Sequence, residues 1–262
     1  MTWMHYSTFT SIMLKQILSL LVMILAACSN PASNPPTPLS PARTFSTSFE
    51  SLSDFDGMFF KTQPTVGQDS ATDYVHSGLR SHKTWLTDTN APSSSTVNNN
   101  HRGYPAIQLW RLPGGSFRTP VRVIFWARVE GTLYSRAPLE DDWISLATLT
   151  CDSTDNWSRS VLVNLDWQGR LHLMHVPLNS QKIQTFVDST HRVTFGRWTK
   201  IETRLTFGSS GFVQVWQDDT LVTSAKVDGC TDRLAQAHFG MYSPPWMKSF
   251  TVWNDDLTIR EE

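Results

Sequence analysis

Apolar and polar residues alternate one by one through much of the chain beyond residue 43, as they do in half-buried β-strands. In the segment 121–129, Val121, Val123 and Phe125 share one face, while Trp126 and Arg128 belong to the other. The other segments that alternate are 160–167, 170–176, 198–207, 212–217, 220–227, 237–242 and 250–253. Short turns rich in Gly, Ser, Gln and Asp separate several of these segments, so we expect antiparallel hairpins.

Helical patterns are weak throughout the chain. Only residues 234–237 are expected to form a helical turn. Residues 98–105, Asn-Asn-Asn-His-Arg-Gly-Tyr-Pro, are expected to form a polar loop that leads into an apolar segment at 106–110. Many short strands without helices predict an all-β fold, either a sandwich or a barrel.

The N-terminal region carries an export signal. Residues 17–27 are apolar and uncharged, but this run is too short to span a bilayer, and Lys15 precedes it. The run ends in Leu-Ala-Ala-Cys at residues 25–28, which looks like a lipobox. We therefore expect residues 1–27 to be a lipoprotein signal peptide and Cys28 to receive lipid. The alternatives are a secretory signal cleaved without lipidation, and a buried helix.

Residues 28–43 are rich in proline, serine and asparagine and read as an extended tether. Residues 44–262 are then one folded domain, exported and lipid-anchored to the cell membrane or the outer membrane, facing the periplasm or the exterior. The net charge is −1 and the basic residues are scattered, so we expect no nucleic-acid partner.

Three cysteines are present, and the predicted lipidation uses one of them. Cys151 and Cys230 remain, in a chain predicted to enter an oxidising compartment. We expect them to form a disulfide; the alternative is two separate buried thiols.

The order of these features resembles the concanavalin A-like lectin/glucanase jelly rolls. Phe-Glu-Ser at 49–51 opens the domain, a tryptophan strand begins at Arg197-Trp198, and residues 253–259 close the chain. This superfamily includes laminin-G-like modules, family 16 glucanases and several polysaccharide lyases. The resemblance implies a two-sheet antiparallel sandwich, and the concave sheet of such proteins usually holds a sugar polymer.

Aromatic and polar residues that alternate within the same strands suit glycan binding, because sugar rings stack on flat rings and sugar hydroxyls need polar partners. The loop at 98–105 adds polar and aromatic side chains for the rim of a groove. The candidate ligand-binding residues are His101, Arg102, Tyr104, Gln108, Trp110, Trp126, Arg128, Gln214, Trp216, His238 and Tyr242. The alternative is that the tryptophans fill the core and the polar loop is only solvated.

Catalysis is left open by the sequence. The Glu-x-Asp-x-x-Glu motif of the family 16 glucanases is absent, which disfavours glycoside hydrolysis. A lyase would need a group that neutralises a uronate carboxylate and groups that move protons. Candidates for these lyase roles are Arg102, Gln108, His175 and Tyr242, with His172 and His238 of the same residue type. The Arg-x-Glu-x-Arg, Gln-Ile-His and Tyr-Phe-Lys-Ala-Gly motifs of jelly-roll lyases are absent.

A structural calcium ion is implied by the same resemblance, because related jelly rolls often join the two chain ends of the domain through calcium. Glu50 and Asp256 occupy the corresponding places and supply hard oxygen ligands. We expect no organic cofactor. The favoured function is non-catalytic polysaccharide binding by a membrane-anchored surface lipoprotein. The alternatives are a polysaccharide lyase that acts by β-elimination, and a structural or protein-interaction module.

Overall fold

The computed structural model describes residues 41–55, 58–87, 100–132, 143–154, 156–178, 184–245, 247 and 249–262. Residues 42–262 form one compact unit. The predicted signal peptide, Cys28 and nearly all of the tether lie outside the described residues. Within the described part of the chain, no helix is long and apolar enough to cross a membrane.

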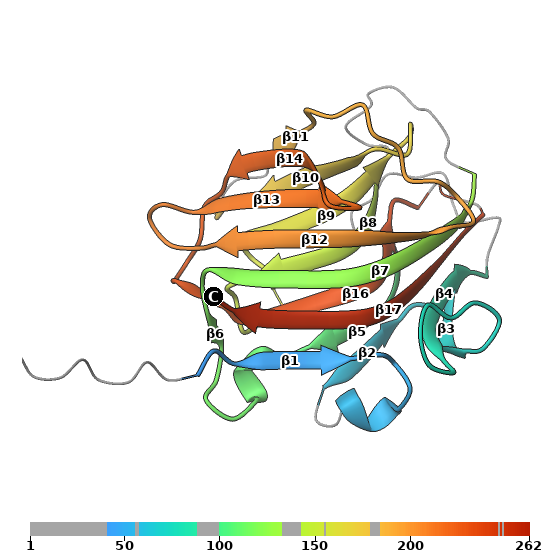
Figure 1. Ribbon diagram of the computed structural model, residues 1–262, viewed down its shortest axis with the longest axis horizontal. Coiled ribbons are helices and arrows are strands. Elements are labelled where there is room, and N and C mark those ends of the chain that lie inside the picture. Colours follow the sequence, from blue (N-terminus) through green and yellow to red (C-terminus); the bar gives the residue numbers. More distant parts are fainter. Residues whose placement is uncertain are drawn as a thin grey trace, which may run out of the picture. The chain divides into compact units, whose positions relative to one another are not determined.

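Two antiparallel sheets make up the fold (Figure 1). The first sheet has the order β14-β13-β12-β7-β17-β4-β3, and β1 also pairs with β17. Its strands are β1 (Thr44–Thr47), β3 (Val66–Ala71), β4 (Ser81–Leu86), β7 (Val121–Gly131), β12 (Trp198–Thr206), β13 (Phe212–Gln217), β14 (Thr220–Lys226) and β17 (Phe250–Glu261).

The second sheet has the order β11-β10-β9-β8-β16-β5-β2. Its strands are β2 (Phe59–Thr62), β5 (His101–Ile107), β8 (Trp143–Thr150), β9 (Ser160–Asp166), β10 (Leu171–Val176), β11 (Gln184–Phe186) and β16 (Gln236–Ser243). Two further short strands, β6 (Phe117–Arg118) and β15 (Arg233–Leu234), pair with each other, and two 3-10 helices occupy Leu52–Phe55 and Leu109–Arg111. The prediction of an all-β, two-sheet antiparallel sandwich is confirmed.

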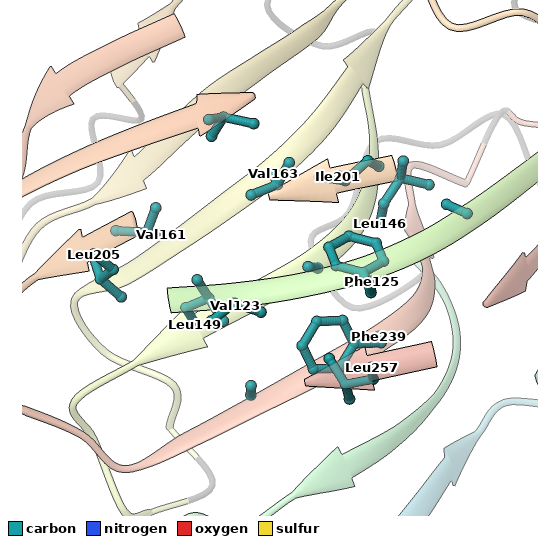
Figure 2. Packing of buried hydrophobic residues seen from close by; sticks show 14 of the residues in the cluster. Val123, Phe125, Leu146, Leu149, Val161, Val163, Ile201, Leu205, Phe239 and Leu257 are labelled. Carbon is teal, nitrogen blue, oxygen red and sulfur yellow. The ribbon is translucent and has the colours of Figure 1, made fainter. Parts of the chain in front are cut away.

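The core lies between the two sheets and is built by the alternation that the sequence shows. In β7, Val123 and Phe125 are fully buried, whereas Ile124 between them is only half-buried. Phe125 meets Phe239 of the second sheet edge to face, with 5.1 Å between ring centroids. Figure 2 shows these two rings among aliphatic side chains of both sheets, including Leu146 and Ile201. Burial of these apolar faces fixes which side of each strand points outward.

Three local predictions are wrong. Residues 101–105, expected to belong to a polar loop, are part of β5, which pairs with β16 on one side and β2 on the other. The segment is polar although it is a strand, because Arg102 and Tyr104 on its outward face line a polar cleft. Residues 109–111 form a 3-10 helix instead of continuing a strand, and residues 234–237 form no helical turn, because β15 and β16 occupy this stretch.

The predicted disulfide between Cys151 and Cys230 is confirmed, with 5.9 Å between the two Cα atoms. It joins the end of β8 to the segment just before β15, across 79 residues of sequence. Structural disulfides form and persist in oxidising compartments, so this bond indicates an extracytoplasmic location.

Candidate functional site

A cleft of about 570 Å³ lies over the outer face of the second sheet. Strands β2, β5, β16, β8, β9 and β10 contribute to its lining, together with the loop that precedes β9. The lining side chains are Lys61, Arg102, Tyr104, Trp143, Thr148, Asn156, Trp157, Ser160, Leu162, Met174, Val176, His238 and Tyr242. Aromatic, cationic and hydroxyl-bearing side chains therefore share one hollow.

The centre of the cleft is set by β16. Phe239 and Met241 of this strand are buried in the core, so His238 and Tyr242 point out of the sandwich into the cleft. A bulge interrupts the pairing of β16 with β8 between Phe239 and Tyr242. Gly240 lies in this bulge with φ of 141°, and a Cβ there would be 2.4 Å from the carbonyl oxygen of Gly103. Only glycine fits this close approach of β16 to β5.

His238 forms part of the cleft floor. Its imidazole lies parallel to the ring of Tyr104, with 3.7 Å between centroids, and Trp157 approaches it edge-on at 4.8 Å. Burial lowers the pKa of His238 to about 3, and the positive charge of Arg102 adds to this effect. At neutral pH the imidazole is therefore uncharged, and it is suited to exchanging hydrogen bonds with ligand hydroxyls.

Tyr242 makes a second group of contacts in the cleft. The guanidinium of Arg102 lies over its ring, with 5.1 Å between the guanidinium carbon and the ring centroid. Asn100 donates its side-chain N–H to the phenolic oxygen at 3.0 Å, and Trp143 meets the ring edge-on at 5.0 Å. The phenol is thus held in place, with a cation and an indole next to it.

The charge in the cleft is positive. Lys61 and Arg102 line it, and no Asp or Glu belongs to the lining among the described residues. A pair of carboxyl groups is required for ordinary glycoside hydrolysis, and the described lining offers none. The arrangement can bind an anionic ligand through its two cations and stack flat sugar faces on its aromatic rings.

The structure brings four predicted site residues together: Arg102, Tyr104, His238 and Tyr242 all line the cleft. Four others lie on the outer face of the opposite sheet, namely Trp126, Arg128, Gln214 and Trp216. There Trp126 is covered by the imidazole of His76, stacked at 3.8 Å between centroids. The eight candidates therefore do not share one face, because their strands belong to different sheets.

The remaining candidates point elsewhere. His101 is buried, with its Nδ1 2.9 Å from the Thr65 hydroxyl. His175 is buried beneath the second sheet, where its Nε2 accepts the backbone N–H of Asp228 at 2.9 Å. Gln108 is buried at the start of a 3-10 helix that contains Trp110. None of His101, His175, Gln108 and Trp110 belongs to the cleft lining.

The predicted calcium ligands hold a loop of the first sheet. Glu50 accepts the backbone N–H groups of Leu79 at 2.7 Å and Arg80 at 3.1 Å. Asp256 contacts His76 Nδ1 and the Ser77 hydroxyl, each at 2.6 Å. Within the described chain, no group of three or more His, Cys, Asp or Glu residues is arranged to hold a metal. Glu50 and Asp256 thus bind backbone and side-chain groups of the segment 76–80, and calcium stays a prediction.

Sequence reasoning did not single out Lys61, Trp143, Asn156 or Trp157 as lining residues. Trp143 begins a strand whose residues are nearly all buried, so that the segment shows little alternation. Trp157 lies in a loop between two strands, where periodicity carries no information. Only the folded arrangement of β8 and β16 brings Trp143 next to Tyr242.

Comparisons with known proteins show which solved structures have a similar fold. Protein-family models give no match to this sequence, and neither do curated proteins. Among solved structures, the chain is similar to an endo-β-1,4-glucuronan lyase from the fungus Trichoderma reesei, with a TM-score of 0.55 and 13% identity over 78% of this chain and 90% of the lyase. It is also similar to the cellulose induced protein Cip1, with a TM-score of 0.57 and 19% identity over 82% of this chain and 95% of Cip1.

These likenesses define the class of protein by its architecture. The domain has the concanavalin A-like jelly-roll fold that the sequence resemblance implied. At these identities the likeness concerns the fold, and the function has to be argued from the cleft itself.

Proposed function

We propose that this protein binds an acidic polysaccharide in the cleft over the second sheet, as a surface lipoprotein anchored through Cys28. The observation that carries the proposal is a hollow that combines Lys61 and Arg102 with four aromatic rings and has no carboxylate in its described lining. Cations attract uronate carboxylates, while the rings of Trp143 and Trp157 offer stacking surfaces for sugars. The disulfide supports the export that the lipoprotein proposal requires.

The binding proposal is tested with the purified full-length protein. Uronate-containing polymers and neutral glycans of similar length are compared by affinity electrophoresis and calorimetry. We expect binding to uronate polymers that weakens as salt rises, because part of the attraction is between charges. A folded protein that binds no glycan would favour the structural or protein-interaction alternative instead.

A polysaccharide lyase is the second candidate, and the Tyr242 phenol held between Asn100 and Arg102 favours it. In β-elimination a base takes the C5 proton of the uronate, the electron pair forms the C4=C5 double bond, and the C4–O bond breaks. The leaving oxygen takes a proton, which Tyr242 would supply, while His238 would be the base. A pKa of about 3 makes His238 a weak base at neutral pH, and this ranks binding above catalysis.

The two candidates are separated by incubating the protein with uronate polymers and following ultraviolet absorbance. The lyase product contains a double bond conjugated to the carboxylate and absorbs, whereas bound but intact polymer does not. Binding without a rise in absorbance supports the non-catalytic proposal. A rise that disappears in a Tyr242→Phe variant supports the lyase.

A further inference from the structure

The two halves of the cleft differ in chemical character. The half over β2 and β5 holds both cations, Lys61 and Arg102. The half over β9 and β10 is lined by Leu162, Met174 and Val176. Hydroxyl groups of nearby threonine and serine residues accompany these apolar side chains, and no charged side chain among the described lining residues lies in this half.

The sheet order keeps these halves apart. Strands β8 and β16 lie between β9 and β5, so the cation-bearing strands and the apolar strands never adjoin. Neighbouring strands are about 4.8 Å apart, which puts β2 and β10 roughly 24 Å from each other. A polymer that lies across the cleft therefore meets both kinds of surface, at different sugar units.

The charged side chains described around the apolar half are paired with one another. Arg159, which directly precedes the lining residue Ser160, lies 3.7 Å from the carboxylate of Asp228. Asp166 and Arg170, at the turn between β9 and β10, form an ion pair with each other at 2.6 Å. His172 of β10 is buried, and its burial lowers its pKa to about 4, so it is uncharged at neutral pH. A sugar carboxylate placed over Leu162 and Met174 would lose hydration and gain no partner there.

An uncharged sugar unit suits this half better. Its C–H face, or the methyl group of an ester or acetyl substituent, covers Leu162 and Met174 without an ionic penalty. Its hydroxyls can reach Thr148 and Ser160, which line the same side. The Lys61 and Arg102 half still requires an ionised carboxylate on a unit further along the chain.

We infer that the cleft selects a polyuronate that is only partly charged, in which an ionised uronate lies near an esterified, acetylated or neutral sugar unit. This inference rests on the proposed binding of an acidic polysaccharide and narrows its substrate class. Fully ionised chains have no uncharged unit to cover the apolar half. Fully esterified chains have no carboxylate to pair with Lys61 and Arg102. Affinity is then greatest at an intermediate degree of esterification.

The test uses the full-length protein at neutral pH and a panel of polyuronates, each as the free acid and after methyl esterification of a third, two thirds or all of its carboxyl groups. We expect the partly esterified forms to bind about tenfold more tightly than either extreme, a difference typical of one methyl group in an apolar pocket. An affinity that rises steadily with charge would overturn this inference while leaving acidic-polysaccharide binding intact. Failure to bind any form would overturn both.

Two variants sharpen the result. Val176→Lys adds a cation at a half-buried position of the apolar half and should move the optimum toward the fully ionised polymer. Lys61→Ala should weaken binding of ionised and partly esterified chains but leave the full ester unaffected. Lys226→Ala, an exposed lysine on β14 of the other sheet, is the matched control and should change none of these affinities. An optimum that Val176→Lys leaves in place would contradict the assignment of the apolar half. The wild-type series decides the inference even if a variant fails to fold.

Discussion

The rings of Tyr104 and His238 are stacked, with 3.7 Å between their centroids and an angle of 11° between their planes. Tyr104 belongs to β5 and His238 to the adjacent β16, and both rings are buried. They therefore form the floor of the cleft, and Trp157 and Tyr242 meet His238 edge-on from above this floor. The stack fixes the orientation of the uncharged His238 imidazole in the cleft lining.

Tyr104→Leu tests the floor. Leucine keeps an apolar side chain at this position but removes the stacked ring, which is worth about 0.5–1.5 kcal/mol as an aromatic pair. We expect polysaccharide affinity to fall by up to about tenfold, with an unchanged circular dichroism spectrum. Equal affinities of the variant and the wild type would show that the orientation of His238 does not matter for binding.

Arg102 is expected to recognise the carboxylate of the ligand. Removing a charge-assisted hydrogen bond costs about 1.5–3 kcal/mol, so Arg102→Ala should weaken uronate binding by about tenfold or more and flatten its salt dependence. Arg102→Lys should recover only part of the loss, because an ammonium lacks the planar fork of guanidinium. Arg260→Ala, on an exposed arginine at the end of β17, is the matched control and should bind normally.

Gly240 is expected to tolerate no side chain. Its φ of 141° and the 2.4 Å approach of a Cβ to the Gly103 carbonyl oxygen both oppose substitution. Gly240→Ala should lower the free energy of unfolding by about 1–3 kcal/mol or more and weaken binding, because His238 and Tyr242 flank it. Gly115→Ala is the matched control: φ is 72°, but no atom lies within 4 Å of the added Cβ. A similar loss in both variants would mean that the close contact with Gly103 is unimportant.

The disulfide is expected to stabilise the domain. Cys151→Ser with Cys230→Ser should lower the free energy of unfolding by about 2–4 kcal/mol, because the bond closes a loop of 79 residues. Urea unfolding is measured with and without a reducing agent. Reduction should bring the wild type to the stability of the double variant and leave the variant unchanged; a wild type that is insensitive to reduction would argue against the bond.

Stability is expected to fall on acidification. Burial lowers the pKa of His82 and His238 to about 3 and that of His172 to about 4, against 6.5 when exposed. Between these values the unfolded chain holds protons that the native chain lacks, so the free energy of unfolding decreases as pH drops below about 6.5. Asp255 acts in the opposite direction, because burial raises its pKa to about 6.

Three histidines should outweigh this one aspartate. We therefore expect the urea midpoint to fall continuously from pH 7 to pH 4 when it is followed by tryptophan fluorescence. His82→Gln removes one of the three buried histidines whose lowered pKa makes the native state less stable in acid, and should make this decline shallower. A midpoint that rises toward pH 4 would show that the histidines do not remain uncharged in the native protein.

The local pattern of the chain was enough to predict strands such as β7 and β12, and their inward faces, because burial of one face imposes a period of two residues. It failed for β5, whose outward side chains are polar at the cleft and whose sequence therefore looks like a loop. The cysteine pair was predictable because two cysteines remain once Cys28 is assigned to the predicted lipidation, in a chain predicted to be exported.

Sheet membership was decided only by the tertiary structure. Trp126 and His238 both occupy outward positions of strands, and from alternation alone both are equally good candidates for the ligand site. Pairing between distant segments puts Trp126 on the first sheet, under His76, and His238 on the second, over Tyr104. Alternation reports which residues share a face of one strand, because it is a local property. Which faces together enclose a cleft depends on contacts between segments far apart in sequence, and no local pattern encodes them.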